Sequence, residues 1–341
     1  MACFRRIVVG MLFVLLLGQY CAAAQRNDYD GDGYSDAAVW WPEFGMWYVW
    51  TSSNGMPPGG GWSAVLDQNQ QPIPGQFYKQ WGLSTDIPVP GDYGGDGCTD
   101  LGVYRRSNQT WYLSCSDPGT YALQFSSALP DAIPVAATFR NAGLANDVKC
   151  DMALYNPGTN RWYVRDSHDL VVETYEGPAP VGAAARDPYV FCTGTESFVG
   201  LYQRYLVGGQ QRVAWSYLAG SGPISLEEWA SHSDVPVSYY PGFTVYFTRW
   251  RTDGHWISVN EYDGQVYADV PWGLAGDTPL VGNYDGSGSD DRCVWRPSEG
   301  RFYVLTSSVG APGGTGWNYI APGAYWKSWG LPGFTPVQCN R

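Results

Sequence analysis

The sequence contains few basic residues and few histidines, and both shortages narrow the functions it can have. Its three histidines, His168, His232 and His255, stand in separate parts of the chain without a metal-ligand spacing. The Gly-x-Ser-x-Gly nucleophile elbow is absent too. The 20 lysines and arginines against 32 aspartates and glutamates give a net charge of -12. Such an acidic chain is a poor partner for nucleic acid, whose phosphates require a basic surface.

Long apolar runs are missing as well, except at the start of the chain. Two arginines precede an apolar run at positions 7–17, and three alanines at 22–24 supply a small-residue cleavage site. Met1–Ala24 is therefore predicted to be a signal peptide, which makes the mature protein secreted, or periplasmic if the host is a Gram-negative bacterium. No later stretch is long and apolar enough to span a bilayer, so membrane insertion is not expected.

A short phrase recurs six times along the remaining sequence. Each copy begins with a proline followed by valine or leucine and continues with an apolar segment that ends in an aromatic residue. A second aromatic segment follows after a turn. Because Trp, Tyr and Val are favoured in strands and the connecting sequences are rich in turn residues, both segments are predicted to be short strands. The copies begin at Pro88, Pro134, Pro180, Pro236, Pro279 and Pro336.

A repeat of about 45 residues cannot bury both faces of its own strands, so such units are expected to stack radially as the blades of a β-propeller. The sequence therefore predicts an all-β fold, a propeller of six blades that are three- to four-stranded antiparallel sheets. Five or seven blades are the alternatives, because the middle repeats are degenerate. The repeat runs through residues 25–341 without a linker, which predicts a single domain. One repeat is divided between the two chain ends, so the last strand is expected to close the ring beside the first blade.

Two stretches rich in glycine and proline interrupt the first and last repeats at matching places. A Thr-Ser-Ser sequence starting at Thr51 is followed by a glycine-rich run and Trp62, and one starting at Thr306 leads in the same way to Trp317. The first and last units are neighbours in a closed ring. We therefore expect matched loop insertions on adjacent blades.

The clearest chemistry lies in residues 28–36, where carboxylates alternate along a loop that contains glycines. Calcium is a hard cation that prefers several oxygen ligands, and this pattern offers them within one tight turn. The loop is not an EF-hand, because its twelfth position is Val39 and a strand follows it. A structural calcium ion that ties the loop to its blade is the prediction, and a solvated acidic turn without metal is the alternative. The expected ligands are the side chains of Asp28, Asp30, Asp32 and Asp36 and the carbonyl of Tyr34.

Other repeats retain parts of this loop. The last repeat keeps oxygen ligands but replaces two carboxylates by neutral groups, which predicts weaker calcium binding. The second repeat keeps Asp92, Asp96 and Asp100, but Gly94 removes the ligand at the third position. In the third repeat Asp151 survives alone. The expected ligands in the last repeat are Asn283, Asp285, Ser287, Ser289 and Asp291.

The segment at residues 88–105 and the matching segment at residues 28–41 resemble the FG-GAP or VCBS-type repeats of secreted bacterial β-propellers. They are also similar to the calcium-bearing hairpins of integrin α-subunit propellers. The resemblance covers nearly the whole mature chain, strongly in the first, second and last repeats and weakly in the middle three. It implies a propeller, structural calcium and a role in adhesion or ligand binding. It implies no particular ligand, because the shared residues hold the blades together.

Six cysteines follow the predicted signal peptide, and an even number in an oxidising compartment predicts disulfides. None of them has the close spacing of a zinc or redox motif. Fifteen connectivities are possible. Closeness in sequence, ring closure and elimination favour the pairs Cys98–Cys115, Cys293–Cys339 and Cys150–Cys192.

Three classes of function are compatible with these features. A non-catalytic recognition or adhesion module for an extracellular glycan or protein is favoured, because the loops of a propeller converge on one face. A secreted hydrolase or lyase acting on polysaccharide is one alternative, since paired carboxylates brought together by folding cannot be seen in a sequence. A structural or assembly protein with calcium-dependent contacts is the other.

Aromatic residues divide into two groups by their place in the repeat. Those at recurring positions are predicted to be blade core, namely Trp47, Trp111, Trp162, Trp256 and Trp295. Those outside the phrase are the candidates for ligand contact, namely Trp62, Trp317, Tyr319, Tyr325, Trp326, Tyr239 and Tyr240.

Overall fold

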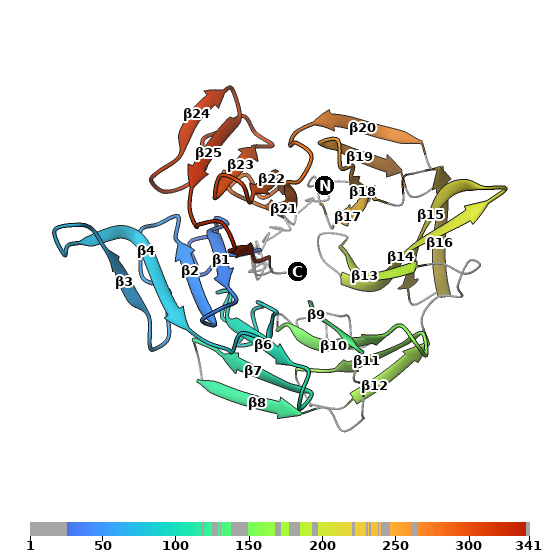
Figure 1. Cartoon of the computed structure of the whole chain (residues 1–341), viewed down its shortest axis with the longest axis horizontal. Helices are drawn as coiled ribbons and strands as arrows, with labels where there is room; N and C mark the ends of the chain where they lie inside the picture. The colour runs from blue at the N-terminus through green and yellow to red at the C-terminus, as the bar shows by residue number, and fades with distance from the viewer. Residues whose placement is uncertain are drawn as a thin grey trace, which may run out of the picture.

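The strands form a ring of antiparallel sheets around a central axis (Figure 1). The computed structural model describes residues 26–116, 119–124, 129, 131–137, 149–167, 172–176, 185–192, 197–219, 222–229, 231, 233–237, 239, 246–260 and 265–338. Within this part of the chain the strands group into six sheets. The predicted all-β propeller fold is therefore confirmed. The predicted signal peptide lies outside the described residues.

Four of these sheets have four strands each. The second sheet contains β5 (Ile87–Pro88), β6 (Leu101–Arg105), β7 (Thr110–Ser114) and β8 (Thr120–Gln124). The third contains β9 (Ile133–Ala137), β10 (Asp151–Asn156), β11 (Arg161–Arg165) and β12 (Val172–Glu176). The fourth contains β13 (Ala185–Cys192), β14 (Ser197–Val207), β15 (Gln210–Ala219) and β16 (Gly222–Trp229). The fifth contains β17 (Val235–Val237), β18 (Tyr246–Trp250), β19 (His255–Asn260) and β20 (Val266–Pro271).

The first and sixth sheets have five strands, one more than expected. The first contains, in spatial order, β26 (Thr335–Pro336), β1 (Ala37–Trp41), β2 (Met46–Trp50), β4 (Pro72–Gln80) and β3 (Ser63–Leu66). The sixth contains β21 (Thr278–Gly282), β22 (Asp291–Arg296), β23 (Arg301–Leu305), β25 (Ala324–Ser328) and β24 (Asn318–Ala321).

The burial of side chains explains why these segments are strands. In β1 and β6 four consecutive side chains are buried, because neighbouring sheets pack on both of their faces. In β2 and β23 buried and half-buried residues alternate, as expected for a strand nearer the rim. The repeated tryptophans are confirmed as core, since each is at most 1% exposed: Trp47, Trp111, Trp162, Trp256 and Trp295.

The chain ends close the ring as predicted. The short strand β26 pairs with β1, with Pro336 opposite Val39 and Thr335 opposite Trp40. Figure 1 shows this dark red strand beside the blue strand β1. The last repeat therefore supplies the innermost strand of the first sheet.

The two insertions lie on adjacent sheets, but they are hairpins rather than loops. Each adds an outer strand, β3 in the first sheet and β24 in the sixth, because the inserted residues pair with β4 and β25. The two hairpins touch, since the Thr315 hydroxyl donates a hydrogen bond of 3.2 Å to the Asn54 side chain.

The fourth repeat begins at a different proline from the one that the spacing indicated. Pro188 lies opposite Leu201 in β14, and this is the register that Pro134 has with Leu154 in the third sheet. Pro180 lies outside the described residues. The repeat spacing indicated the wrong proline because Pro188 precedes its partner Leu201 by 13 residues, whereas Pro134 precedes Leu154 by 20.

The predicted disulfides are not formed where the structure tests them, because Cys98, Cys115 and Cys293 are free. Cys98 faces the first sheet, where a Cβ on Gly31 would lie 2.8 Å from its sulfur. Cys115 packs in the core between the second and third sheets, so these two thiols point to opposite sides of one blade.

Cys293 is buried in the core shared by the sixth and first sheets. Cys339 and the side chain of Cys192 lie outside the described residues. The pair Cys150–Cys192 therefore stays a prediction.

A cavity of about 320 Å³ lies between the innermost strands. Its lining includes repeat prolines, which have no N–H to offer to a neighbouring strand. They are Pro88, Pro134, Pro188, Pro236 and Pro279. Among the described residues no helix is long and apolar enough to cross a membrane.

Candidate metal centre

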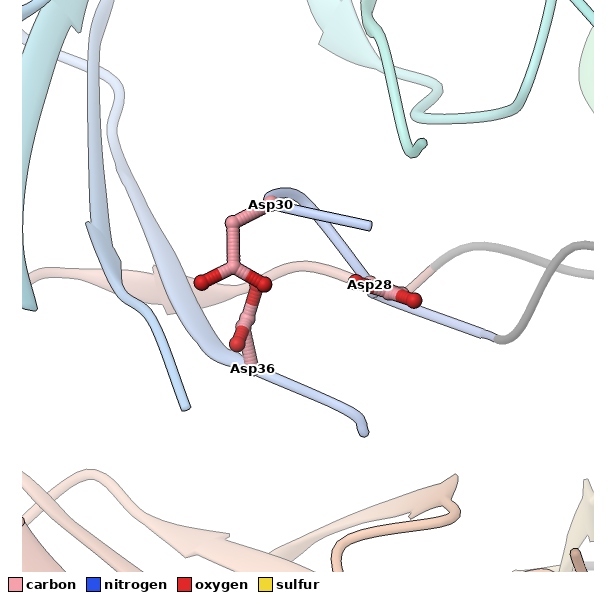
Figure 2. A group of neighbouring side chains, drawn as sticks. All are labelled: Asp28, Asp30 and Asp36. Carbon is pink, nitrogen blue, oxygen red and sulfur yellow. The ribbon is translucent and has the colours of Figure 1, made fainter. Parts of the chain in front are cut away.

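Three carboxylates converge in the loop that leads into β1. The ligand oxygens of Asp28, Asp30 and Asp36 all lie within 4.8 Å of one another. Figure 2 shows the carboxylates of Asp30 and Asp36 directed toward each other, with Asp28 beside them. No other group of three histidine, cysteine, aspartate or glutamate residues in the described part of the chain meets this condition.

The loop folds around the first carboxylate. The Oδ1 of Asp28 accepts hydrogen bonds from the backbone N–H groups of Gly31 and Asp32, at 2.7 and 3.1 Å, and its Oδ2 accepts one from Gly33 at 2.8 Å. Gly31 and Gly33 have φ angles of 79° and 88°, which side chains other than glycine rarely adopt. The glycines of the motif are therefore required by the turn itself.

The last carboxylate of the loop has a structural role that recurs in four sheets. Asp36 is buried and accepts hydrogen bonds from the backbone N–H groups of Tyr29 at 2.7 Å and Ser52 at 2.6 Å. The bond to a serine sixteen residues later ties the loop to the end of the hairpin that follows. It recurs in the pairs Asp100–Ser116, Asp151–Ser167 and Asp291–Ser307.

This recurring bond explains why Asp151 survives where the rest of the loop is lost. Sequence reasoning treated the ninth position as a metal ligand only. The signal that could have revealed its second role is the constant spacing of aspartate and serine in four repeats.

The middle carboxylates are held by the Thr-Ser-Ser segment, which sequence reasoning did not connect to the loop. The Ser52 hydroxyl lies 2.7 Å from both carboxylate oxygens of Asp32. The Ser53 hydroxyl donates to Oδ2 of Asp30. The other oxygen of Asp30, Oδ1, is buried and has no hydrogen-bond partner. An unpaired buried carboxylate oxygen among two further carboxylates fits a bound cation.

The pKa values of these aspartates also favour a bound cation. Burial, and then the charges of Asp32 and Asp30, raise the pKa of Asp28 to about 7. Burial, followed by the charges of Asp30 and Asp28, raises the pKa of Asp36 well above its usual range. Burial also raises the pKa of Asp30. A divalent cation would neutralise this repulsion, because an opposite charge within a few ångströms favours the ionised carboxylates.

The loop of the second sheet lacks the converging group. Asp92 accepts N–H bonds from Gly95, Asp96 and Gly97 in the same way as Asp28 does from its own loop. At the third position, Gly94 instead donates its N–H to Asp100 at 2.9 Å. The structure therefore supports a calcium site here less well than in the first loop.

The two aspartates in the loop of the sixth sheet differ: burial and the charge of Asp285 raise the pKa of Asp291 to about 7, whereas Asp285 itself is held by hydrogen bonds. Burial would raise the pKa of Asp285, but hydrogen bonds from Ser308 and Ser287 outweigh it and lower the pKa. The Asn283 side chain donates to the carbonyl of Gly33 in the first loop at 3.2 Å. Ser289 at the seventh position donates its N–H to Ser287. The five predicted oxygen ligands therefore lie in one loop but form no acidic cluster.

Most of the candidate ligand-binding aromatics are covered. Tyr239 is only 7% exposed and packs under Arg292, so it is core, which corrects its assignment as a contact residue. Trp62 and Trp317 are half-buried beneath Lys79 and Lys327.

The remaining candidates lie on β24 and β25 or outside the described residues. Trp326 is half-buried under Arg301, and Tyr325 is half-buried against Tyr319. Tyr319 is 64% exposed on the outermost strand β24. Tyr240 lies outside the described residues.

One contact between a histidine and an aspartate resembles a catalytic pair. His255 Nδ1 lies 2.6 Å from Asp269 on neighbouring strands, with both side chains at least one-third exposed. His168 and His232 lie outside the described residues. Neither residue lines the cavity between the innermost strands.

No protein-family model matches the chain, and no curated protein matches it. Solved structures do. Virginiamycin B lyase from Staphylococcus aureus is 10% identical, with 83% of this chain and 85% of that chain covered and a TM-score of 0.42. AztD from Citrobacter koseri is 9% identical, with 89% of each chain covered and a TM-score of 0.41. BamB from Moraxella catarrhalis is 9% identical, with 80% of this chain and 92% of that chain covered and a TM-score of 0.36. At these identities the likeness concerns the fold alone, and the FG-GAP or VCBS membership stays a prediction.

Proposed function

We propose that the protein is a secreted, calcium-binding β-propeller that acts as a non-catalytic recognition or adhesion module. The observation that carries the calcium assignment is the convergence of Asp28, Asp30 and Asp36 around the unpaired Oδ1 of Asp30. In this proposal the ion is structural. Its ligands are the four aspartates of residues 28–36 and the carbonyl of Tyr34.

The ligand of the module is proposed to be an extracellular glycan or protein. Support comes from the outer hairpin of the sixth sheet, where all four residues of β24 are exposed and Tyr319 offers an aromatic face to solvent. The acidic composition is compatible with either class of ligand and not with nucleic acid.

Isothermal titration of the mature protein with calcium chloride tests the metal assignment. We expect one tight site in the unaltered protein and loss of that site in the variant Asp30→Asn. Asp285→Asn is the matched control, because Asp285 holds the third position of the sixth loop and is hydrogen-bonded locally. Equal binding by both variants would refute the site.

Glycan arrays and protein-binding screens, each run with calcium and with chelator, test the recognition role. We expect binding that weakens in the variant Tyr319→Ala without a change in calcium affinity. Turnover of a polysaccharide by the purified protein would instead favour an enzyme.

A further inference from the structure

The loop at residues 28–36 lies at the one place in the ring where the chain ends meet. We call this place the seam and define it as the contacts between residues 26–52 and residues 283–338. Across it the Ser35 N–H donates to the Asn283 carbonyl at 2.9 Å, and the Asn283 N–H donates back to the Ser35 hydroxyl at 2.8 Å. The calcium loop itself therefore forms part of the seam.

Further seam contacts are buried. Arg26 and Asp290 form an ion pair at 3.5 Å with side chains that are 0% and 1% exposed. The ring of Tyr34 packs on the backbone of the sixth sheet, where a Cβ on Gly286 would lie 2.4 Å from it. The loop is thus clamped from the side of the sixth sheet by backbone, charge and packing together.

The strand that closes the seam is weak by itself. β26 contains two residues, and Pro336 has no N–H to donate to β1. The next backbone bond, from the Val337 N–H to the Ala38 carbonyl, is 3.2 Å long. Few backbone hydrogen bonds have to break for this strand to leave.

The metal site and the seam depend on the same residues. Asn283 binds Gly33 and Ser35, which lie between the ligands Asp32 and Asp36. If the sixth sheet moved away, this part of the loop would lose the contacts that fix its backbone. The ligand cluster and the closed seam therefore stabilise each other, and such coupling is reciprocal.

We propose that calcium in the loop at residues 28–36 is a latch on the seam, so that the ring opens between the first and sixth sheets only after the ion has left. The proposal rests on the calcium site of the proposed function. It assigns to that site control over one specific interface, beyond general stabilisation of a blade.

Hydrogen exchange of the mature protein, followed by mass spectrometry over a series of free calcium concentrations, tests the latch. The reporter is the N–H of Val337, which bonds to Ala38 at the seam but outside the calcium loop, with Leu154 in the third sheet as the remote control. If opening requires release of the ion, exchange at the seam slows in proportion to free calcium, by about 100-fold at 100 times Kd. Exchange at Leu154 is expected to change far less.

Two variants and a parallel titration separate the possible failures. In Asp30→Asn the seam should exchange at the calcium-free rate at every concentration, whereas Asp285→Asn should respond as the unaltered protein does. Calcium binding by titration with protection confined to residues 28–36, or with equal protection at Leu154, would overturn the latch and leave the proposed function standing. No binding by titration would overturn the proposed function itself.

Discussion

The acidic loops of the first and sixth sheets share a backbone plan but differ in charge. Both place an aspartate at the third position that binds a serine hydroxyl, Asp30 with Ser53 and Asp285 with Ser308. In the sixth loop neutral residues replace the aspartates at the first and fifth positions. Burial raises the pKa of Asp28 to about 7 and raises that of Asp30, whereas burial is outweighed at Asp285 by serine hydrogen bonds, which lower its pKa. Asp291, at the ninth position of the sixth loop, has its pKa raised to about 7 by burial and by the charge of Asp285.

The comparison shows that the turn accepts a neutral residue at its first position. Asn283 takes over the first position, and its Oδ1 accepts a bond from the Gly288 N–H at 3.2 Å, much as Oδ2 of Asp28 accepts one from Gly33. The extra carboxylates of the first loop destabilise the folded state unless a cation neutralises them. We therefore expect charge at the first and fifth positions to decide which of the two loops binds a metal ion.

Removing calcium should give the largest effect. With excess chelator we expect the free energy of unfolding to fall by about 3 kcal/mol relative to calcium at 100 times Kd, because the ion binds only the folded state. Thermal unfolding with and without calcium measures this, and Asp30→Asn should abolish the difference. A calcium response that survives in Asp30→Asn and disappears in Asp285→Asn would reverse the comparison.

Transplanting charge should convert the sixth loop into a second site. In the double variant Asn283→Asp, Ser287→Asp we expect calcium titration to reveal two sites, with a gain of about 2 kcal/mol in excess calcium. Without calcium the same variant should be less stable than the unaltered protein, because the new carboxylates are uncompensated. A single site in this variant would mean that charge at these positions is not what decides metal binding.

The first loop should also make stability depend on pH when calcium is absent. Burial first raises the pKa of Asp28 to about 7, so between pH 4 and pH 7 its folded form holds a proton that the unfolded chain has released. Stability therefore falls as pH rises through this range, by about 2 kcal/mol or more. Urea unfolding in chelator at pH 5 and pH 7.5 measures the fall. Saturating calcium should remove the part due to the first loop and leave the part due to Asp100 and Asp291, whose pKa values burial also raises to about 7. An unchanged midpoint in chelator would contradict the raised pKa.

The smallest effect concerns one residue that differs between the two hairpins. Asn54 and Val309 occupy matching positions with φ angles of 65° and 66°, in the left-handed region that a β-branched side chain adopts with strain. Val309→Asn should therefore stabilise the protein by about 1 kcal/mol, and Asn54→Val should destabilise it by a similar amount. Thermal unfolding of the two variants in saturating calcium tests the pair. Equal midpoints would show that the position carries no strain.

The propeller architecture could be predicted from the sequence because the residues of the repeat determine local structure. Prolines, paired aromatics and alternating aspartates each specify a strand edge, a buried face or a turn. The closure by Pro336 could be predicted as well, because the partial repeat at one chain end can be completed only by the partial repeat at the other. The register of the fourth sheet was missed because the connection between its two inner strands is shorter, with 13 residues from Pro188 to Leu201 against 20 from Pro134 to Leu154.

Other features depend on contacts between repeats, which a single repeat does not reveal. Asp86 forms a two-point ion pair with Arg105, and Asp277 forms one with Arg296. At the closing blade the matching residues are Phe334 and Trp41, whose rings lie 5.1 Å apart. That an aromatic pair replaces the ion pair at this place could not be predicted, because only the structure shows that the two positions are in contact.

The pairing of β26 with β1 also has a consequence for the order in which the molecule is made. The first sheet is synthesised early but is completed late, because its innermost strand consists of residues 335 and 336. Until those residues arrive, β1 presents a bare edge that another nascent chain could pair with. A premature stop codon before residue 335 would remove this strand and leave the edge of β1 permanently exposed to pairing with another chain.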